Sequence, residues 1–195
     1  MKRMSIENSS VMKFLTLVST LVCAPLLMAT SMVPVSVETL TDKAELIMQG
    51  KATRSWSAWN AQHTLIYTYT EFIVDRTLKG NVAASATGSA GNVVVKQMGG
   101  TVGGTSQHVS GIRYWQPGEE AVLFLRASEV RDNTQVVVGL TQGTFRVERL
   151  SSGEVRVSNG APEVHFFETG GEQSAAQPKP MTLKDLETRI RKASQ

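Results

Sequence analysis

Three histidines follow residue 31, and they are the side chains best suited to proton transfer or metal binding. His63 and His108 are 45 positions apart, and His165 lies 57 positions further on. The chain contains no His-x-His pair and no HExxH pattern, which are the spacings that place two imidazoles on one face of a strand or helix for zinc. We therefore predict solvated or structural histidines, and we expect no metal and no cofactor.

Two glycine-rich segments have only part of a catalytic motif. Gly99–Gly104 lacks the Lys-Ser/Thr ending of a P-loop, the GxGxxG spacing and a following long helix that would bind phosphate. Gly88-Ser89-Ala90-Gly91 would need a glycine in place of Thr87 to form the GxSxG nucleophile elbow. Both segments are predicted to be loops without catalytic function.

Glu119 and Glu120 are adjacent carboxylates that follow a Pro-Gly turn. Neighbouring residues on a strand point to opposite faces, so these two cannot act as a paired acid and base, and we expect both to be exposed at the turn. No catalytic residue is assigned, and the protein is expected not to be an enzyme. The alternative is a hydrolase whose site is assembled from separate strands, for instance from His63, His108 and Glu120.

The tryptophans are the strongest candidates for ligand binding. Trp56 and Trp59 lie near the end of a predicted strand, where indoles could stack on a sugar or a peptide. Because they are three positions apart, they should face opposite sides of the strand, so one of them is expected in the core. Trp115 is the third residue predicted to bind ligand.

Cysteine content and charge narrow the function classes further. The only cysteine, Cys23, lies in an N-terminal apolar segment, so a processed chain has no thiol for a disulfide, a metal site or a nucleophile. The chain has 20 basic and 17 acidic residues, and removal of residues 1–31 takes away three basic residues and one acidic residue, which leaves a net charge of +1. This balance gives no reason to expect nucleic acid as a partner.

Residues 1–31 have the features of a cleavable signal peptide. The apolar run Phe14–Met28 follows a lysine, is shorter than the ~20 residues of a membrane-spanning helix, and contains Pro25. Ala29 and Ser31 suit the −3 and −1 positions of cleavage after Ser31, with cleavage after Ala29 as the alternative. We expect a secreted or periplasmic protein with no stable membrane span after processing; an uncleaved anchor is the other possibility.

Alternating apolar and polar residues predict a mainly β domain after the leader. The clearest strand is His63–Leu78, in which Tyr67 and Tyr69 share the polar face and six residues form the apolar face: Ile66, Thr68, Thr70, Phe72, Val74 and Leu78. Further strands are predicted at Glu45–Trp59, Asn92–Met98, Ile112–Trp115, Glu120–Ala127, Thr134–Leu140, Thr144–Leu150 and Glu154–Ser158. One or two helical turns are expected within Ser36–Ala44.

The regular spacing of these strands, with glycine-rich turns, favours a small closed or partly open antiparallel barrel (OB-like) or a sandwich around one apolar interior. We assign this β-barrel domain to residues 32–160 and a linker to residues 161–181. Residues 182–193 form a C-terminal helix, capped by Thr182, that is expected to pack on the barrel through a narrow apolar stripe. The stripe consists of Leu183, Leu186 and Ile190.

Three segments, Ala44–Ala52, Ile66–Gly80 and Gly118–Leu125, together resemble a type of uncharacterised exported bacterial β-domain. More distantly, they resemble the netrin and tissue-metalloproteinase-inhibitor module, which is an OB-fold barrel. The similarity covers much of residues 44–150 and consists of strand and turn patterns. In the inhibitor family a disulfide-tethered N-terminal cysteine binds the catalytic metal, and this chain has no cysteine after Cys23. The resemblance therefore implies a fold but not that mechanism.

These observations predict an exported, non-enzymatic β-barrel module that binds a protein, a peptide or a glycan. A proteinase-inhibitor-like protein is one alternative, and an envelope-associated structural protein or the hydrolase described above is another.

Overall fold

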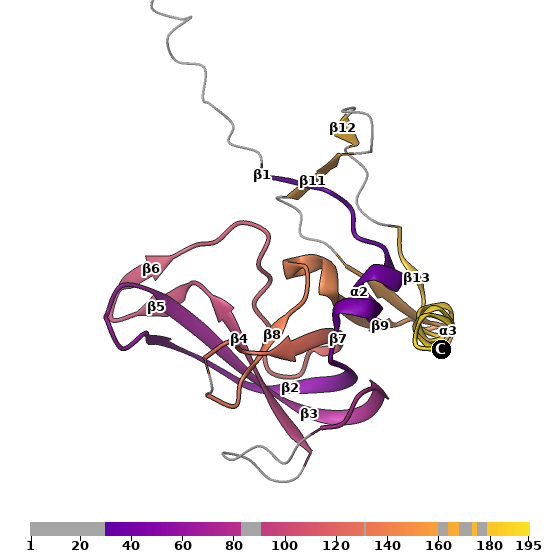
Figure 1. The fold of residues 1–195 in the computed structure, drawn as a ribbon, viewed down its shortest axis with the longest axis horizontal. Coiled ribbons are helices and arrows are strands. Elements are labelled where there is room, and N and C mark those ends of the chain that lie inside the picture. Colours follow the sequence, from indigo (N-terminus) through magenta and orange to yellow (C-terminus); the bar gives the residue numbers. More distant parts are fainter. Residues whose placement is uncertain (1–29, 83–90, 131, 160–163, 168–172, 175–178) are drawn as a thin grey trace, which may run out of the picture.

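The computed structural model describes residues 30–82, 91–130, 132–159, 164–167, 173–174 and 179–195. Residues 1–29 of the predicted signal peptide lie outside the described residues, as do Ser89 and most of its loop. The described part is mainly β and ends in a helix, as predicted (Figure 1).

Eight strands form the main sheet in the order β13-β10-β9-β7-β2-β3-β4-β8, and β7 also pairs with β8. Their bounds are β2 Leu46–Trp59, β3 Ile66–Lys79, β4 Asn92–Met98, β7 Glu120–Ala127, β8 Gln135–Val137, β9 Thr144–Arg149, β10 Val155–Ser158 and β13 Met181–Thr182. The expectation of a purely antiparallel sheet is wrong, because β4 and β8 are parallel and pair through Val95 and Gln135. The chain passes through β7 between them and enters β8 in the same direction as β4.

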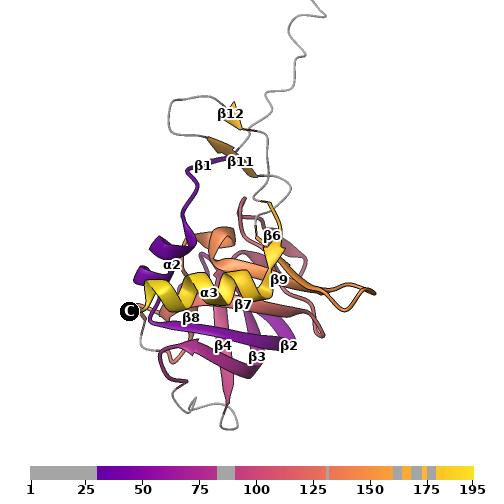
Figure 2. The same cartoon turned by 90° about the vertical axis from the view of Figure 1, so that its right-hand side faces the viewer.

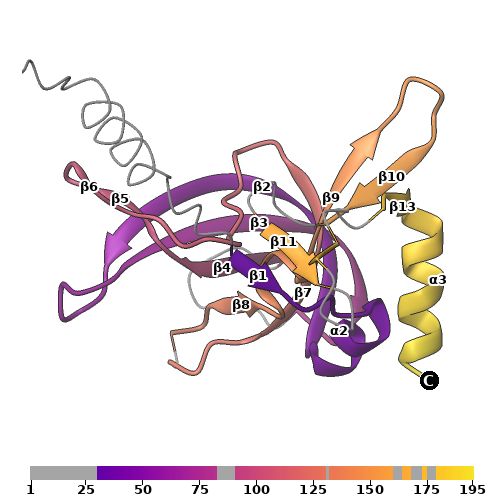
Figure 3. The same ribbon diagram turned by 90° about the horizontal axis from the view of Figure 1, so that it is seen from above.

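Two smaller sheets accompany the main one. β5 (Gly100–Val102) and β6 (Thr105–Gln107) form a hairpin at the opposite end of the molecule from the C-terminal helix (Figure 3). β1 (Thr30–Met32), β11 (Val164–Phe167) and β12 (Gln173–Ser174) form a separate three-stranded sheet. β11 and β12 lie inside the predicted linker, and the predicted cleavage site falls inside β1, which pairs with β11.

The interior consists of two apolar clusters on opposite faces of β2 and β7, where one interior was expected. Ile47 of β2 and Phe124 of β7 belong to the first cluster. Their chain neighbours Met48 and Leu123 belong to the second. Since successive side chains of a strand alternate between faces, β7 is buried on both sides, as its continuous apolar run predicts.

Two helices cover the first cluster. In α2 (Val37–Lys43) the Ser36 hydroxyl accepts a hydrogen bond from the backbone N–H of Thr39, and Leu40 is buried. In α3 (Leu183–Ala193) the Thr182 hydroxyl accepts from the N–H of Asp185, which confirms the predicted cap. Its buried residues are Leu186 and Ile190, so the helix packs on the sheet as expected, beside α2 (Figure 2).

An ion pair between the two helices gives a pH-dependent prediction. Arg189 donates to both carboxylate oxygens of Glu38, at 2.8 and 2.7 Å, and these hydrogen bonds lower the pKa of Glu38 from 4.5 to about 2. Because the folded-state pKa lies below the unfolded one, the pair stabilises the fold fully above pH 4.5 and loses its effect as the pH falls towards 2. Both side chains are about half exposed, so we expect less than about 1 kcal/mol.

The measurement is urea unfolding of the wild type and Glu38→Gln at about pH 6 and about pH 2.5. The variant is expected to be less stable at the higher pH, and the difference should shrink at the lower pH. A difference of equal size at both pH values would contradict the assignment.

Gly143, at the end of the 3-10 helix η1 (Leu140–Gly143), gives a steric prediction. It is buried, and a Cβ at this position would overlap the backbone carbonyl oxygen of Val138. We expect Gly143→Ala to lower the free energy of unfolding by about 2–3 kcal/mol, because a backbone atom cannot move aside cheaply. Gly103→Ala is the control, because a Cβ there meets nothing within 4 Å. Only the left-handed φ of 55° is unfavourable for alanine, and we expect it to lower the free energy of unfolding by about 1 kcal/mol. Equal losses in urea unfolding would refute the steric argument.

Candidate functional site

Trp115, one of the three tryptophans predicted to bind ligand, lies in the core. It is fully buried, and its ring meets Phe72 edge to face with the centroids 6.0 Å apart. The Arg113 guanidinium lies 4.7 Å from the centroid of the same ring. The predicted strand Ile112–Trp115 does not form, although both of its end residues are buried. A side chain without exposed surface offers no contact to a ligand, so Trp115 is not part of the candidate site.

Trp56 and Trp59 face opposite sides of β2, as their spacing predicts. Trp56 lies opposite Tyr69 of β3, whereas Trp59 lies opposite the buried Ile66. The expectation that one indole would be in the core is wrong, because Trp56 is 38% exposed and Trp59 is half-buried and stacks on His63. The two rings therefore form no common platform, and only Trp56 belongs to the surface described next.

The solvent-facing side of β2, β3 and β4 carries a row of aromatic and cationic side chains. We call this surface the aromatic face, and it consists of Arg54, Trp56, Tyr67, Tyr69 and Lys96. The strand register places Trp56 beside Tyr69 and Tyr69 beside Lys96. The rings of Trp56 and Tyr69 stack with centroids 5.6 Å apart. The Arg54 guanidinium lies 4.6 Å from the centroid of Trp56, and the Lys96 ammonium lies 4.5 Å from that of Tyr67, so a cation stands at each end of the row.

Each cation of the aromatic face is paired with a carboxylate. Arg54 Nε lies 2.8 Å from Glu71, and Lys96 Nζ lies 2.9 Å from Asp132. Burial disfavours the charged form of Lys96, but the hydrogen bond to Asp132 and the electrostatic interactions with Tyr69, Asp132 and Tyr67 together outweigh it and raise the pKa of Lys96. Burial also opposes ionisation of Asp132, but hydrogen bonds from Thr134 and Lys96 lower the pKa of this carboxyl. Both groups are therefore charged at neutral pH, and the two pairs balance in charge.

A hollow of about 300 Å³ lies beside Trp56 and Tyr69, and we call it the aromatic hollow. Its lining combines two aromatic rings, one guanidinium, one aliphatic side chain and three short polar side chains: Arg54, Trp56, Tyr69, Val94, Asp132, Asn133 and Thr134. A turn holds the polar wall in place, since the N–H and hydroxyl of Thr134 donate to Asp132 Oδ1 at 3.2 and 2.6 Å. Asn133 supplies the left-handed φ of 57° that this turn uses. The Asp132 carboxylate is thus oriented before any ligand arrives.

The structure does not bring His63, His108 and Glu120 into one site. Glu120 lies opposite Lys51 of β2, which is eight residues, or roughly 26 Å along a strand, from Trp59. His63 stacks on Trp59 at that far end, and both histidines are exposed. Across residues 30–195, apart from the undescribed gaps, no three His, Cys, Asp or Glu side chains are placed to hold a metal ion.

Glu119 and Glu120 are not exposed at the turn, contrary to expectation. Glu119 forms ion pairs with Arg113 at 3.0 Å and Arg146 at 3.2 Å, and Glu120 binds Arg149 at 2.7 Å. Only 18% and 19% of the two carboxylate side chains are exposed. Arg146 and Arg149 come from the neighbouring strand β9, which local spacing does not reveal. The two carboxylates have separate partners and are already neutralised.

Of the residues of the site, sequence reasoning named only Trp56, and it missed Arg54, Tyr67, Tyr69 and Lys96 of the aromatic face and Asp132 of the hollow. A signal for the tyrosines was present, because the alternation of β3 assigns both to its polar face. Their position beside Trp56 depends on the pairing of β3 with β2, and Lys96 joins them through the pairing with β4. Asp132 reaches Lys96 from a loop 36 positions away, which no local pattern indicates.

The fold and the site define a mainly β protein with an aromatic, charge-balanced surface on three adjacent strands. Neither a protein-family model nor a curated protein matches the chain. Among the described residues, the helices lack the combination of length and apolar character that is needed to span a membrane.

Proposed function

We propose that this protein is an exported, non-enzymatic binding module whose aromatic face binds a glycan. The observation that carries the proposal is the aromatic hollow, where the rings of Trp56 and Tyr69 adjoin the carboxylate of Asp132, Asn133 and the Arg54 guanidinium. Sugar rings present C–H groups that pack on aromatic side chains and hydroxyl groups that both donate and accept hydrogen bonds. Carboxylate, amide and guanidinium groups supply the matching acceptors and donors.

An OB-like barrel is part of this proposal. Its support is the ring of pairings from β2 through β3, β4, β8 and β7 back to β2, in which β4–β8 is the parallel contact. A bulge beside Gly50 favours the strong bending that lets β2 pair with both β3 and β7. In barrels of this type the second and third strands form the face that binds oligosaccharides or oligonucleotides, and these strands correspond to β3 and β4.

The composition of the hollow favours a glycan over a peptide. Among the described residues, Val94 is the only aliphatic side chain in its lining, so the hollow offers little aliphatic contact to the side chains that anchor peptides. Among the described residues of the aromatic face, both cations are paired, Arg54 with Glu71 and Lys96 with Asp132, so neither is in excess for a phosphate backbone. A neutral polyhydroxyl ligand suits both properties.

The test is titration of the protein, purified from the exported fraction, with a panel of soluble neutral oligosaccharides. We expect saturable binding by calorimetry and a change in tryptophan emission, because the exposed Trp56 would be covered. Binding of peptides but of no glycan in the panel would overturn the proposal. Release of new reducing ends from a bound glycan would overturn its non-enzymatic part. N-terminal sequencing of the same material shows whether cleavage occurs after Ser31.

A further inference from the structure

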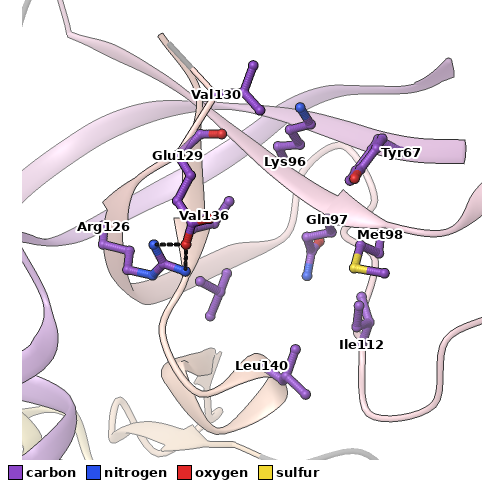
Figure 4. A pocket seen from close by; sticks show the side chains of 12 residues that line it. Tyr67, Lys96, Gln97, Met98, Ile112, Arg126, Glu129, Val130, Val136 and Leu140 are labelled. Atoms are coloured by element: carbon purple, nitrogen blue, oxygen red, sulfur yellow. Dashed lines mark hydrogen bonds and ion pairs between the residues drawn. The ribbon is translucent and has the colours of Figure 1, made fainter. Parts of the chain in front are cut away.

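A second cavity, separate from the aromatic hollow, lies between β4 and β8, and we call it the β4–β8 cavity (Figure 4). It exists because these strands pair at a single position, Val95 with Gln135. Its volume of about 320 Å³ is within the range of small-molecule sites, roughly 300–1,000 Å³. The aliphatic part of its lining consists of Met98, Ile112, Val130, Val136, Val137 and Leu140.

Gln97 provides an unsatisfied polar group in this lining. Gln97 is buried, with only 7% of its surface exposed. Its Oε1 atom has no hydrogen-bond partner among the described residues. A buried carbonyl oxygen without a donor is unfavourable, and nearly all such atoms in proteins are satisfied. A ligand that carries an O–H or N–H group would supply the missing donor.

Arg126 provides a positive charge on the other side of the cavity. Figure 4 shows Arg126 and Gln97 on different sides of the cavity, with the Arg126 guanidinium turned toward Glu129. The ion-pair partner of Arg126 is Glu129, at 3.3 Å, and 84% of the Glu129 side chain is exposed. Such a contact is weak in water, so a ligand carboxylate could replace Glu129 at little cost.

We propose that the β4–β8 cavity binds a small aromatic acid that carries a hydroxyl group, of the p-hydroxyphenylacetate class. The hydroxyl donates to Gln97 Oε1, the carboxylate pairs with Arg126, and the ring packs between them. Met98 favours an aromatic ring over an aliphatic chain, because a thioether packs well at a ring edge. Tyr67, also in the lining, adds an aromatic contact.

The test compares three probes by calorimetry at neutral pH. p-Hydroxyphenylacetate has all three features, phenylacetate lacks the hydroxyl, and p-cresol lacks the carboxylate. We expect p-hydroxyphenylacetate to bind more tightly than either of the other two probes, by a factor of about five or more. Chemical-shift changes on binding should include the Gln97 side-chain amide and the Met98 methyl group. Equal affinity for all three probes, or no binding of any at millimolar concentration, would overturn the proposal.

Variants assign each contact. Gln97→Met should abolish the preference over phenylacetate, and Arg126→Met should abolish the preference over p-cresol. Because Gln97→Met alters a buried position, Glu129→Gln is the variant that leaves the fold intact: it removes the competing carboxylate and should tighten binding about twofold or more. Weaker binding by Glu129→Gln would contradict the role of Arg126. Trp56→Ala should leave binding of p-hydroxyphenylacetate unchanged, which separates this cavity from the glycan site.

Discussion

Replacing Trp115 by alanine is expected to lower the free energy of unfolding by about 3–5 kcal/mol. The side chain is fully buried and is the largest among the fully buried residues. It contacts Phe72 edge to face, so truncation removes both the transfer free energy of the indole and an aromatic contact. The Arg113 guanidinium, which stacks on the ring, would lose this contact and keep its ion pair with Glu119.

The measurement is urea unfolding followed by circular dichroism, because tryptophan emission itself changes in this variant. Trp59→Ala is the matched control: Trp59 is half-buried and stacks on His63, so we expect a loss of about 1 kcal/mol. Similar losses in the two variants would contradict the assignment of Trp115 to the core. Trp115→Phe should recover part of the stability, since a smaller ring still fills part of the space.

Replacing Trp56 by alanine is the second large effect that we expect, and it concerns binding. Affinity for the glycan should fall about tenfold or more, because the indole forms one wall of the aromatic hollow and stacks on Tyr69. The free energy of unfolding should change by about 1 kcal/mol, since Trp56 is 38% exposed. Calorimetric titration with the tightest glycan of the panel measures the first quantity, and urea unfolding measures the second.

Trp59→Ala again serves as the control, now for binding. The substitution removes the same side chain three positions along β2 but on the opposite face, so affinity should stay within about twofold of the wild type. If Trp59→Ala weakened binding as much as Trp56→Ala, the glycan would not lie on the aromatic face. If neither did, the hollow would not be the binding site. Asp132→Asn tests the polar wall and should weaken binding by a smaller factor.

Local patterns predicted most of the individual elements. The strands β4 and β7 begin and end where alternation and apolar runs place them, α2 lies within the predicted Ser36–Ala44, and Thr182 caps α3 as expected. These features depend on residues within one turn or one strand, so a window of sequence contains the forces that determine them. β8 is shorter than its apolar run predicts, because Gly139 and Leu140 adopt left-handed φ values of 69° and 56° and turn the chain into η1.

The sequence by itself determined which faces of the strands are apolar, that Thr182 caps the C-terminal helix and that Trp56 and Trp59 lie on opposite faces of β2. Only the tertiary structure decided that Trp56, Tyr69 and Lys96 are neighbours, that Asp132 completes their surface, and that Gln97 and Arg126 border one cavity. The physical reason is that alternation sets the face of a strand, whereas its neighbours are set by the register of backbone hydrogen bonds between segments far apart in the chain.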